Sequence, residues 1–292
     1  MTRPGFLVIT PVACALGVAI TVWQGAIFSF WVAGVATCAA VLMHAAANVL
    51  NDYHDAQSGA DEANTQGLFP FTGGARLIQN GEVSVEQTRA WAYALAVGAA
   101  LLGVWLTWQV GEVVVTLGVL GLFLGWSYSA EPLRLMSRGL GELSVGLAWA
   151  LMVWGSAAVC QTDWSLAAGL AALGYGAWVT NILLINGFPD APADAAVGKR
   201  TAVVRAGPRL AAQIYIGSAA ASYVLLIGAI LGEVLPPEAA WAALSLPTAC
   251  LGAIELWRHA HEPQQLRPAV MCTIISTLIY GLGMTAGLLS AA

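Results

Sequence analysis

The sequence predicts an all-α integral membrane protein with nine transmembrane helices, from its composition, its apolar runs and the placement of its charges. The 292-residue chain is 59% hydrophobic and 9% charged, with a mean hydropathy of +0.74. A soluble domain carries about 25% charged residues, so this chain has too few charges to cover a surface that faces water. No alternation of apolar and polar residues is sustained, as a membrane β-barrel would require.

Nine apolar runs account for most of the chain. Each approaches the ~20 residues that a helix needs to cross ~30 Å of hydrocarbon. We expect the first run to be a retained helix and not a cleaved signal peptide, because it is long and no small-residue cleavage site ends it. The runs cover residues 6–24, 27–50, 88–109, 112–130, 141–160, 164–186, 209–232, 237–259 and 267–290.

The basic residues test this count. With nine spans, the N-terminus and the loops after spans two, four, six and eight lie on one side of the membrane. All eleven basic residues fall on that side: Arg3, Arg76, Arg89, Arg134, Arg138, Lys199, Arg200, Arg205, Arg209, Arg258 and Arg267. The opposite loops carry only Glu112, Asp163, Glu233 and Glu238. Because basic loops stay in the cytoplasm, we predict a multi-pass protein of the cytoplasmic membrane with this side inside.

Two aspartate clusters follow spans two and six on the same side. The first runs from Asn51 to Asp55, with Asp61 beyond it, and the second runs from Asp190 to Asp194. Carboxylates near hydrocarbon cost roughly 2.5–3.5 kcal/mol each on insertion scales at the helix centre, so they indicate a functional site. The clusters lie four spans apart, which suggests a single domain, 1–292, built from two four-helix halves. These halves cover about 1–130 and 141–259, and a ninth helix follows at 267–290.

The spacing inside each cluster indicates a metal site. If the helix continues past span two, Asp52 and Asp55 share a face, as do Asp190 and Asp194. Like charges at this spacing repel, and Mg²⁺ relieves the repulsion by binding one or two carboxylates together with substrate phosphates. The alternative is that the acidic residues are solvated caps and turns. Two clusters at matching places, in a chain with few charges, favour metal ions that hold a polyanion.

Three loops on this side add donors for an anion. Lys199 follows the second cluster closely, and Arg134 and Arg138 lie between spans four and five. Gly73 and Gly74 form a glycine pair just before Arg76, and such a pair can bring backbone N–H groups near an anion. The basic residues are dispersed and form no stripe, so nucleic acid is not an expected partner.

The stretches that carry these clusters resemble the two aspartate-rich motifs of the UbiA superfamily of intramembrane prenyltransferases. The first motif is similar to 51–61 and the second to 186–205. The loops at 71–76 and 128–142 resemble those of the MenA-type branch, whose members prenylate 1,4-dihydroxy-2-naphthoate. The resemblance covers essentially the whole chain. It implies helices around a central cavity with a cytoplasmic cap of loops.

The resemblance also implies roles for matching residues. Two Mg²⁺ ions bridging a substrate diphosphate would be held by Asp52, Asp55, Asp190, Asp194 and Asp61, the first four being catalytic. The diphosphate would be contacted by Asn48, Asn51, Asn186, Lys199, Arg134, Arg138 and Arg76. Apart from the resemblance, the chain offers residues that could stabilise a carbocation or meet an acceptor: Tyr128, Tyr53, Glu131 and His44.

The chain departs from the family pattern at two places. Many relatives carry an arginine shortly after the first motif, where this sequence reads Asn64-Thr65-Gln66. Either Arg76 compensates or the diphosphate sits differently. Glu131 stands where a neutral residue is expected. Its carboxylate could act as a base near the acceptor, or it could simply be solvated. Both departures concern the acceptor more than the diphosphate chemistry.

We therefore expect Mg²⁺-dependent transfer of a prenyl group from a prenyl diphosphate to an aromatic quinone precursor, of the kind used for menaquinone, with release of diphosphate. Metal ions and basic side chains stabilise the leaving charge, and an apolar cavity excludes water from the cation. Two alternatives stay open. A terpene cyclase of the same superfamily would close the cation without an acceptor. A cation transporter would need acidic residues at the membrane midplane, whereas these lie at one face. No protein partner is implied.

Overall fold

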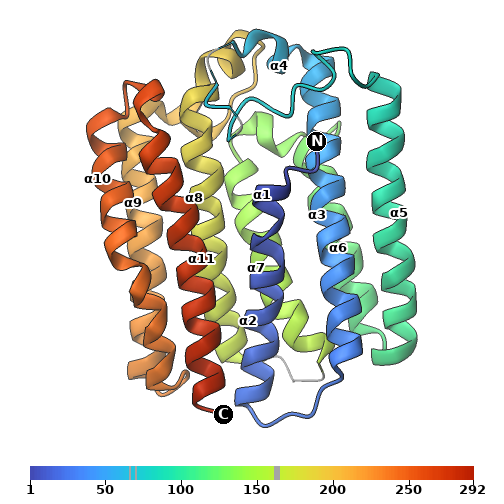
Figure 1. Cartoon of the computed structure of the whole chain (residues 1–292), viewed down its shortest axis with the longest axis vertical. Helices are drawn as coiled ribbons and strands as arrows, with labels where there is room; N and C mark the ends of the chain where they lie inside the picture. Colours follow the sequence, from blue (N-terminus) through green and yellow to red (C-terminus); the bar gives the residue numbers. More distant parts are fainter. Residues whose placement is uncertain (66, 70, 161–164) are drawn as a thin grey trace.

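The computed structural model describes residues 1–65, 67–69, 71–160 and 165–292, and these form helices with no strand among them (Figure 1). The all-helical prediction is therefore confirmed for the described chain. Gln66 of the first departure and Asp163 of the acidic side lie outside the described residues.

Within the described ranges, eight helical stretches are long and apolar enough to cross a membrane. They are α1 and α2 (Pro4–Leu7 and Ile9–Trp23), α3 (Phe30–Ser58), α5 (Val85–Val110), α7 (Gly141–Val159), α8 (Leu166–Ala196), α9 (Ala202–Leu231), η2 with α10 (Pro237–Ser245 and Leu246–His259) and α11 (Arg267–Ser290). The predicted run at 112–130 forms α6 (Val113–Ser129), which is apolar but has only 17 residues. Short helices α4 (Ala60–Ala63), η1 (Leu135–Arg138) and η3 (Pro263–Gln265) lie in the connections.

Two helices continue well beyond the apolar runs that predicted them. Helix α3 was expected to end near residue 50 but runs to Ser58, where Gly59 adopts a left-handed conformation (φ 76°) and ends it. Helix α8 was expected to end near 186 but runs to Ala196, through Pro189 and Pro192. Both aspartate clusters therefore lie on helical turns. Asp52 and Asp55 were expected to share a helix face only if the helix continued past span two, and α3 does continue.

Helix α9 contains a break that explains a boundary in the sequence. The helix begins at Ala202, and Gly207 inside it has φ 73° and ψ 163°, followed by Pro208. The predicted run began at 209, so it matches the segment after the break. The segment before the break has only five residues, and Arg205 and the Gly207-Pro208 pair separate it from the apolar run that follows.

The helices pack closely because glycine lies at their contacts. Helix α2 packs against α7 and α11, α8 packs against α7 and α9, and α3 packs against α5. A Cβ on Gly17 would lie 2.3 Å from the carbonyl oxygen of Val153, and one on Gly176 would lie 2.5 Å from that of Gly146. Only a residue without a side chain fits at such distances, as is typical of helix contacts in membranes.

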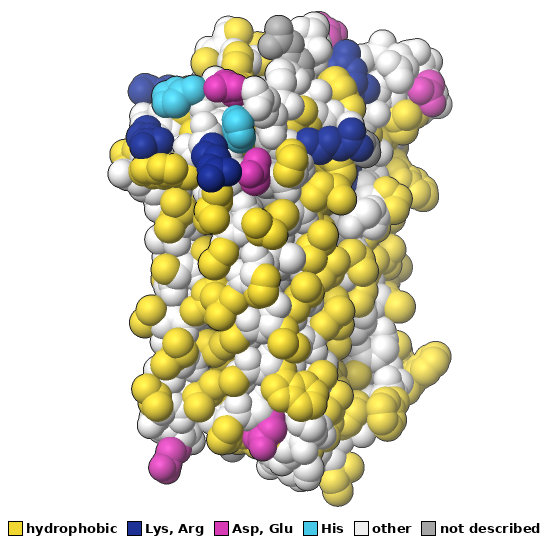
Figure 2. Space-filling model, turned by 60° about the vertical axis from the view of Figure 1, so that its left-hand side comes forward, with side chains coloured by type: hydrophobic (Ala, Val, Ile, Leu, Met, Phe, Trp, Pro, Cys, Tyr) yellow, Lys and Arg dark blue, Asp and Glu magenta, His cyan; other side chains and the backbone are white. Residues whose placement is uncertain are grey.

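The surface shown in Figure 2 is arranged as a membrane protein requires. Hydrophobic side chains cover the middle of the molecule, and Lys and Arg gather at one end. Large apolar side chains on the helices face outward, including Trp108 (79% exposed) and Val224 (68% exposed). Hydrocarbon tails would cover such side chains in a bilayer.

Candidate functional site

Two adjoining cavities lie between the helices, toward the end that carries the aspartates. One is mostly apolar and reaches down between α2, α3, α6, α7 and α8. The other is polar and lies under the connection that contains α4. They share five lining residues: Arg3, Asn51, Tyr128, Leu183 and Asn186. A ligand with a charged head and an apolar body could therefore occupy both at once.

Lys199 joins the two aspartate clusters. Its Nζ lies 2.9 and 3.0 Å from the two carboxylate oxygens of Asp55 on α3, and 3.4 Å from Oδ1 of Asp194 on α8. Burial by itself lowers the pKa of Lys199, but Asp55 and Asp194 outweigh it, so the net shift of this pKa is upward. Lys199 therefore stays protonated. One carboxylate from each cluster therefore contacts the same ammonium group.

The connection after α4 holds two further carboxylates. Asn64 donates to Oδ1 of Asp190 at 2.6 Å, and the backbone N–H of Gly73 donates to its Oδ2 at 3.4 Å. A Cβ on Gly74 would lie 2.7 Å from Oδ2 of Asp61, so only glycine leaves room for that carboxylate. Burial, with the nearby charges of other aspartates, raises the pKa of Asp61 to about 7. The glycine pair therefore brings a backbone N–H group, that of Gly73, beside an anion, and in this structure the anion is the carboxylate of Asp190.

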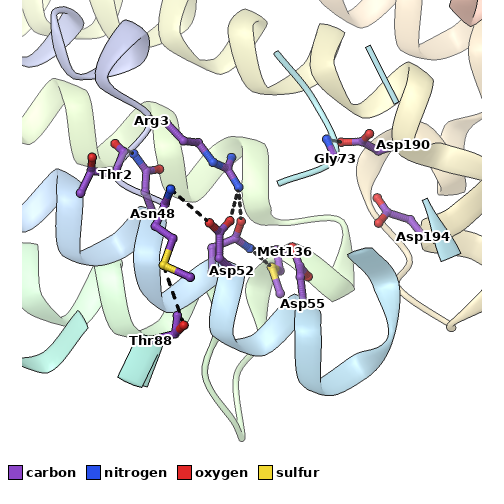
Figure 3. A network of polar contacts seen from close by, with 12 residues as sticks. Thr2, Arg3, Asn48, Asp52, Asp55, Gly73, Thr88, Met136, Asp190 and Asp194 are labelled. Atoms are coloured by element: carbon purple, nitrogen blue, oxygen red, sulfur yellow. Dashed lines mark hydrogen bonds and ion pairs between the residues drawn. The ribbon is translucent and has the colours of Figure 1, made fainter. Parts of the chain in front are cut away.

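Asp52 is placed differently from the other four aspartates. It is buried but lines neither cavity, because Arg3 lies over it: the Nη2 atom of Arg3 is 2.7 Å from Oδ1 of Asp52 and 3.1 Å from Oδ1 of Asn51 (Figure 3). Asn48 holds the same N-terminal segment by donating to the carbonyl oxygen of Thr2 at 3.1 Å. In this arrangement Asn48 anchors the chain and Asp52 anchors a guanidinium group.

Arg3 was missed as a site residue, although it lines both cavities. Its Nε is buried and has no hydrogen-bond partner among the described residues. Burial lowers its pKa, Asp52 raises it more, and the net upward shift of the pKa keeps Arg3 charged. In the sequence, Arg3 was recognised only as a marker of membrane sidedness. Nothing in the spacing shows that the N-terminus folds back onto α3.

Besides Asp52, five predicted residues lie away from both cavity linings. Arg76 donates to the carbonyl oxygens of Asp61 and Asn64 at 3.1 and 2.8 Å, so it fastens the connection after α4. Arg134 pairs with the exposed Glu131 at 3.3 Å, and Arg138 donates to the carbonyl of Pro132. Tyr53 packs in the buried cluster with Val49, Leu50 and Ala92. The structure therefore brings none of the predicted set Arg76, Arg134, Arg138, Tyr53 and Glu131 into either lining.

Five other predicted residues do reach the cavities, and one of them, Asn48, lines the apolar cavity. Asn51 and Asn186 line both, and Oδ1 of Asn186 is buried with no hydrogen-bond partner among the described residues. Tyr128 lies at the junction of the two cavities. His44 lines the apolar cavity only.

The donor chemistry of the polar cavity fits Mg²⁺. Five carboxylates line it, together with the unpartnered amide oxygen of Asn186: Asp55, Asp61, Glu142, Asp190 and Asp194. Among the described residues there is no preformed group of three or more side chains that would enclose an ion. Mg²⁺ commonly binds through one or two carboxylates and takes its remaining ligands from substrate phosphates and water. The cavity suits ions that arrive with a phosphorylated ligand.

Comparison with known proteins agrees with this geometry. A family model described as "UbiA prenyltransferase family" matches residues 10–286. A protein of Bacillus subtilis (strain 168) described as "1,4-dihydroxy-2-naphthoate octaprenyltransferase" is 24% identical in an alignment of 293 residues, gaps included, that covers 99% of this chain and 91% of the relative.

Two solved structures share the fold. A UbiA homolog from Aeropyrum pernix K1, in its apo form, aligns with a TM-score of 0.70 and 18% identity over 95% of this chain and 97% of that one. A UbiA homolog from Archaeoglobus fulgidus, bound to DMAPP and Mg²⁺, aligns with a TM-score of 0.58 and 14% identity over 98% of each chain.

Proposed function

The chain belongs to the UbiA prenyltransferase family, and from that premise we propose that it transfers a prenyl group from a prenyl diphosphate to an aromatic quinone precursor within the membrane. Diphosphate is released, and Mg²⁺ is the cofactor. One observation supports this above all: a cationic side chain, Lys199, contacts carboxylates of both motifs in a polar cavity that continues into an apolar one.

The polar cavity would bind the diphosphate. Asp55, Asp61, Asp190 and Asp194 would hold two Mg²⁺ ions, whose chemistry is to stabilise the negative charge that develops on the leaving diphosphate. Lys199 would donate to the diphosphate oxygens and reinforce this stabilisation. In the resting arrangement it neutralises the carboxylates that the ions would occupy.

Arg3 would be the second cation at the diphosphate. Asp52 fixes its guanidinium group at the junction of the cavities, which is where the bond to diphosphate would break. Asp52 would thus act through Arg3, and it would meet a metal ion only if that ion pair opened. This differs from the sequence expectation, in which Asp52 binds the metal directly.

The apolar cavity would hold the reacting carbon and the acceptor. Its walls include Phe6, Ile9 and Leu124, apolar side chains that offer no hydrogen bond to water, so water would be disfavoured beside an allylic cation. The ring of Tyr128, at the junction, would stabilise the cation through its π face. An isoprenoid chain can continue between the helices toward lipid.

We also propose nine membrane crossings with the site on the cytoplasmic side. The two termini lie toward opposite ends of the molecule in Figure 1, which supports an odd number of crossings. Helix α6, at about 26 Å for its 17 residues, would add the ninth to the eight longer stretches. The basic end would then face the cytoplasm of the cell membrane. Helices α3 and α8 would occupy equivalent positions in the two four-helix halves.

The test uses purified protein in lipid nanodiscs with Mg²⁺, prenyl diphosphates of several lengths and two acceptors, 1,4-dihydroxy-2-naphthoate and 4-hydroxybenzoate. We expect a prenylated acceptor by mass spectrometry, and none after chelation with EDTA. A cyclised hydrocarbon or alcohol formed without acceptor would replace this proposal with the cyclase. No product from any pair of substrates would overturn the transferase.

A further inference from the structure

One polar side chain lies deep in the apolar cavity, apart from the carboxylates. His44 is on α3, one helical turn before Asn48, and its residue surface is 6% exposed. It lines the apolar cavity and is absent from the lining of the polar one. Polar rings buried at such positions cost free energy unless they are hydrogen-bonded, so both ring nitrogens of His44 must be considered.

One ring nitrogen is satisfied within the protein. Nδ1 of His44 lies 2.8 Å from the hydroxyl oxygen of Thr10, which is fully buried on α2. The indole of Trp149 on α7 packs against the imidazole, with ring centroids 4.7 Å apart and planes at 87°. Three helices therefore fix the orientation of this ring.

The other ring nitrogen is available. Nε2 of His44 has no hydrogen-bond partner among the described residues. The N–H of Trp149, which packs on the same ring and lines the same cavity, is also buried without a partner in the described chain. If Thr10 accepts from Nδ1–H, Nε2 keeps its lone pair and can accept a hydrogen bond. An oxygen atom of a ligand in this corner could satisfy both groups.

We propose that His44 is a catalytic residue that binds the phenolic hydroxyl of the aromatic acceptor and removes its proton during transfer. This inference rests on the proposed prenyl transfer and names the acceptor as a hydroxylated aromatic ring. Thr10 is a positioning residue, since it acts only by holding Nδ1.

In the proposed step, the bond from prenyl C1 to the diphosphate oxygen breaks, and its electron pair leaves with diphosphate. A ring carbon activated by the hydroxyl forms the new bond to C1, while the hydroxyl proton moves to Nε2 of His44 and the oxygen becomes a carbonyl. The hydrogen on the attacked carbon then passes to the released diphosphate, and the oxygen regains its proton from His44. His44 ends neutral, as it began.

The first measurement is binding without donor, so it does not depend on turnover. The probes are 1,4-dihydroxy-2-naphthoate and its 1,4-dimethoxy ether, with affinity measured by calorimetry in nanodiscs. We expect the wild-type protein to prefer the dihydroxy compound about tenfold, since one buried hydrogen bond is at stake. His44→Phe keeps a flat ring and should remove the preference. His261→Phe, an exposed histidine in the loop after α10, is the matched control and should keep it.

The second measurement is steady-state transfer. His44→Phe should lower kcat about 10²-fold or more, as loss of a general base does, and leave the KM for the prenyl diphosphate unchanged. Thr10→Val keeps the imidazole but loses its tether, and should lower kcat by about tenfold. This second variant also serves if His44→Phe does not fold.

The outcomes separate this inference from the proposed function. If His44→Phe, or Thr10→Val in its place, retains the preference for the dihydroxy probe and a kcat within twofold of wild type, His44 is only a packing residue and the inference fails. If the wild-type protein shows the preference but transfers no prenyl group, the proposed function fails while the binding role of His44 stands. If the wild-type protein transfers prenyl groups but binds both probes equally, the inference fails alone.

Discussion

Helices α3 and α8 carry matching aspartate pairs, but they present them differently. On α8, Asp194 meets Lys199, and Asp190 meets the connection after α4, so both line the polar cavity. On α3, only Asp55 lines it, while Asp52 lies behind Arg3. Residues four apart on a helix point in nearly the same direction, whereas residues three apart diverge further. The two motifs are therefore unequal. Asp52, which points away from the polar cavity, binds Arg3 of the N-terminal segment instead.

The difference between α3 and α8 predicts unequal losses of activity when their aspartates are neutralised one at a time. Asp55→Asn and Asp194→Asn should each lower kcat by about 10³-fold, because each removes a charge that would hold Mg²⁺ against the diphosphate. Asp52→Asn should lower it by only about tenfold, because Arg3 keeps a hydrogen-bond acceptor in that place.

The measurement is initial rate against Mg²⁺ concentration for all three variants, with thermal unfolding to check folding. Glu112→Gln, at the opposite end of the molecule, is the control and should match the wild type. Equal losses in the Asp52 and Asp55 variants would show that α3 and α8 are equivalent in catalysis, contrary to the structure.

The helices and most charged residues of the site could be predicted from the sequence. The apolar runs located all the long helices, because length and hydropathy decide which segments enter a bilayer. The clusters, Lys199 and Tyr128 were found because charge and polarity are conspicuous against an apolar background. The long extensions of α3 and α8 were not predicted, because their polar end turns are stabilised by contacts with distant loops.

Arg3 and Arg134 show why the other residues of the site could not be predicted from the sequence. Arg3 reaches the cavities because the N-terminal segment folds back onto Asn48, a contact between residues 46 positions apart. Arg134 looked equally suitable, but it has a left-handed backbone (φ 41°) and pairs with Glu131. Side-chain direction at a loop depends on tertiary contacts, and spacing along the chain does not reveal it.

A second prediction concerns the cation between the two helices. Lys199→Gln leaves Asp55 and Asp194 close together without their shared partner. Breaking a buried ion pair by removing one partner costs about 3–5 kcal/mol, so the melting temperature should fall clearly without metal. Mg²⁺ with inorganic diphosphate should recover most of the loss, because the ions would take over the role of the ammonium group.

Differential scanning fluorimetry in detergent, with and without Mg²⁺ and diphosphate, measures both quantities. Arg200→Gln, the exposed neighbour, is the control and should change neither. A metal-free melting temperature equal to that of the wild type would mean that Lys199 does not stabilise the contact between α3 and α8.

A third prediction tests the N-terminal arginine. Arg3→Gln should raise the KM for the prenyl diphosphate about tenfold, because one charge-assisted hydrogen bond to the diphosphate is lost. Arg3→Lys should recover part of the effect. Arg89→Gln, a basic residue exposed on α5, serves as the control in the same kinetic assay. An unchanged KM in the Arg3 variant would leave Arg3 as a structural partner of Asp52 only.

The smallest expected effect lies in the connection that faces α8. Gly74 has φ 71°, and a Cβ there would press on the carboxylate of Asp61. Gly74→Ala combines backbone strain with displacement of that carboxylate, at about 1 kcal/mol. The Mg²⁺ concentration for half-maximal rate should therefore rise about fivefold, with the melting temperature little changed. Gly81→Ala, with φ 73° but open space around it, controls for backbone strain alone. Equal Mg²⁺ dependence in the two variants would mean that Asp61 does not hold the metal, leaving Asp55 on α3 to face the α8 pair alone.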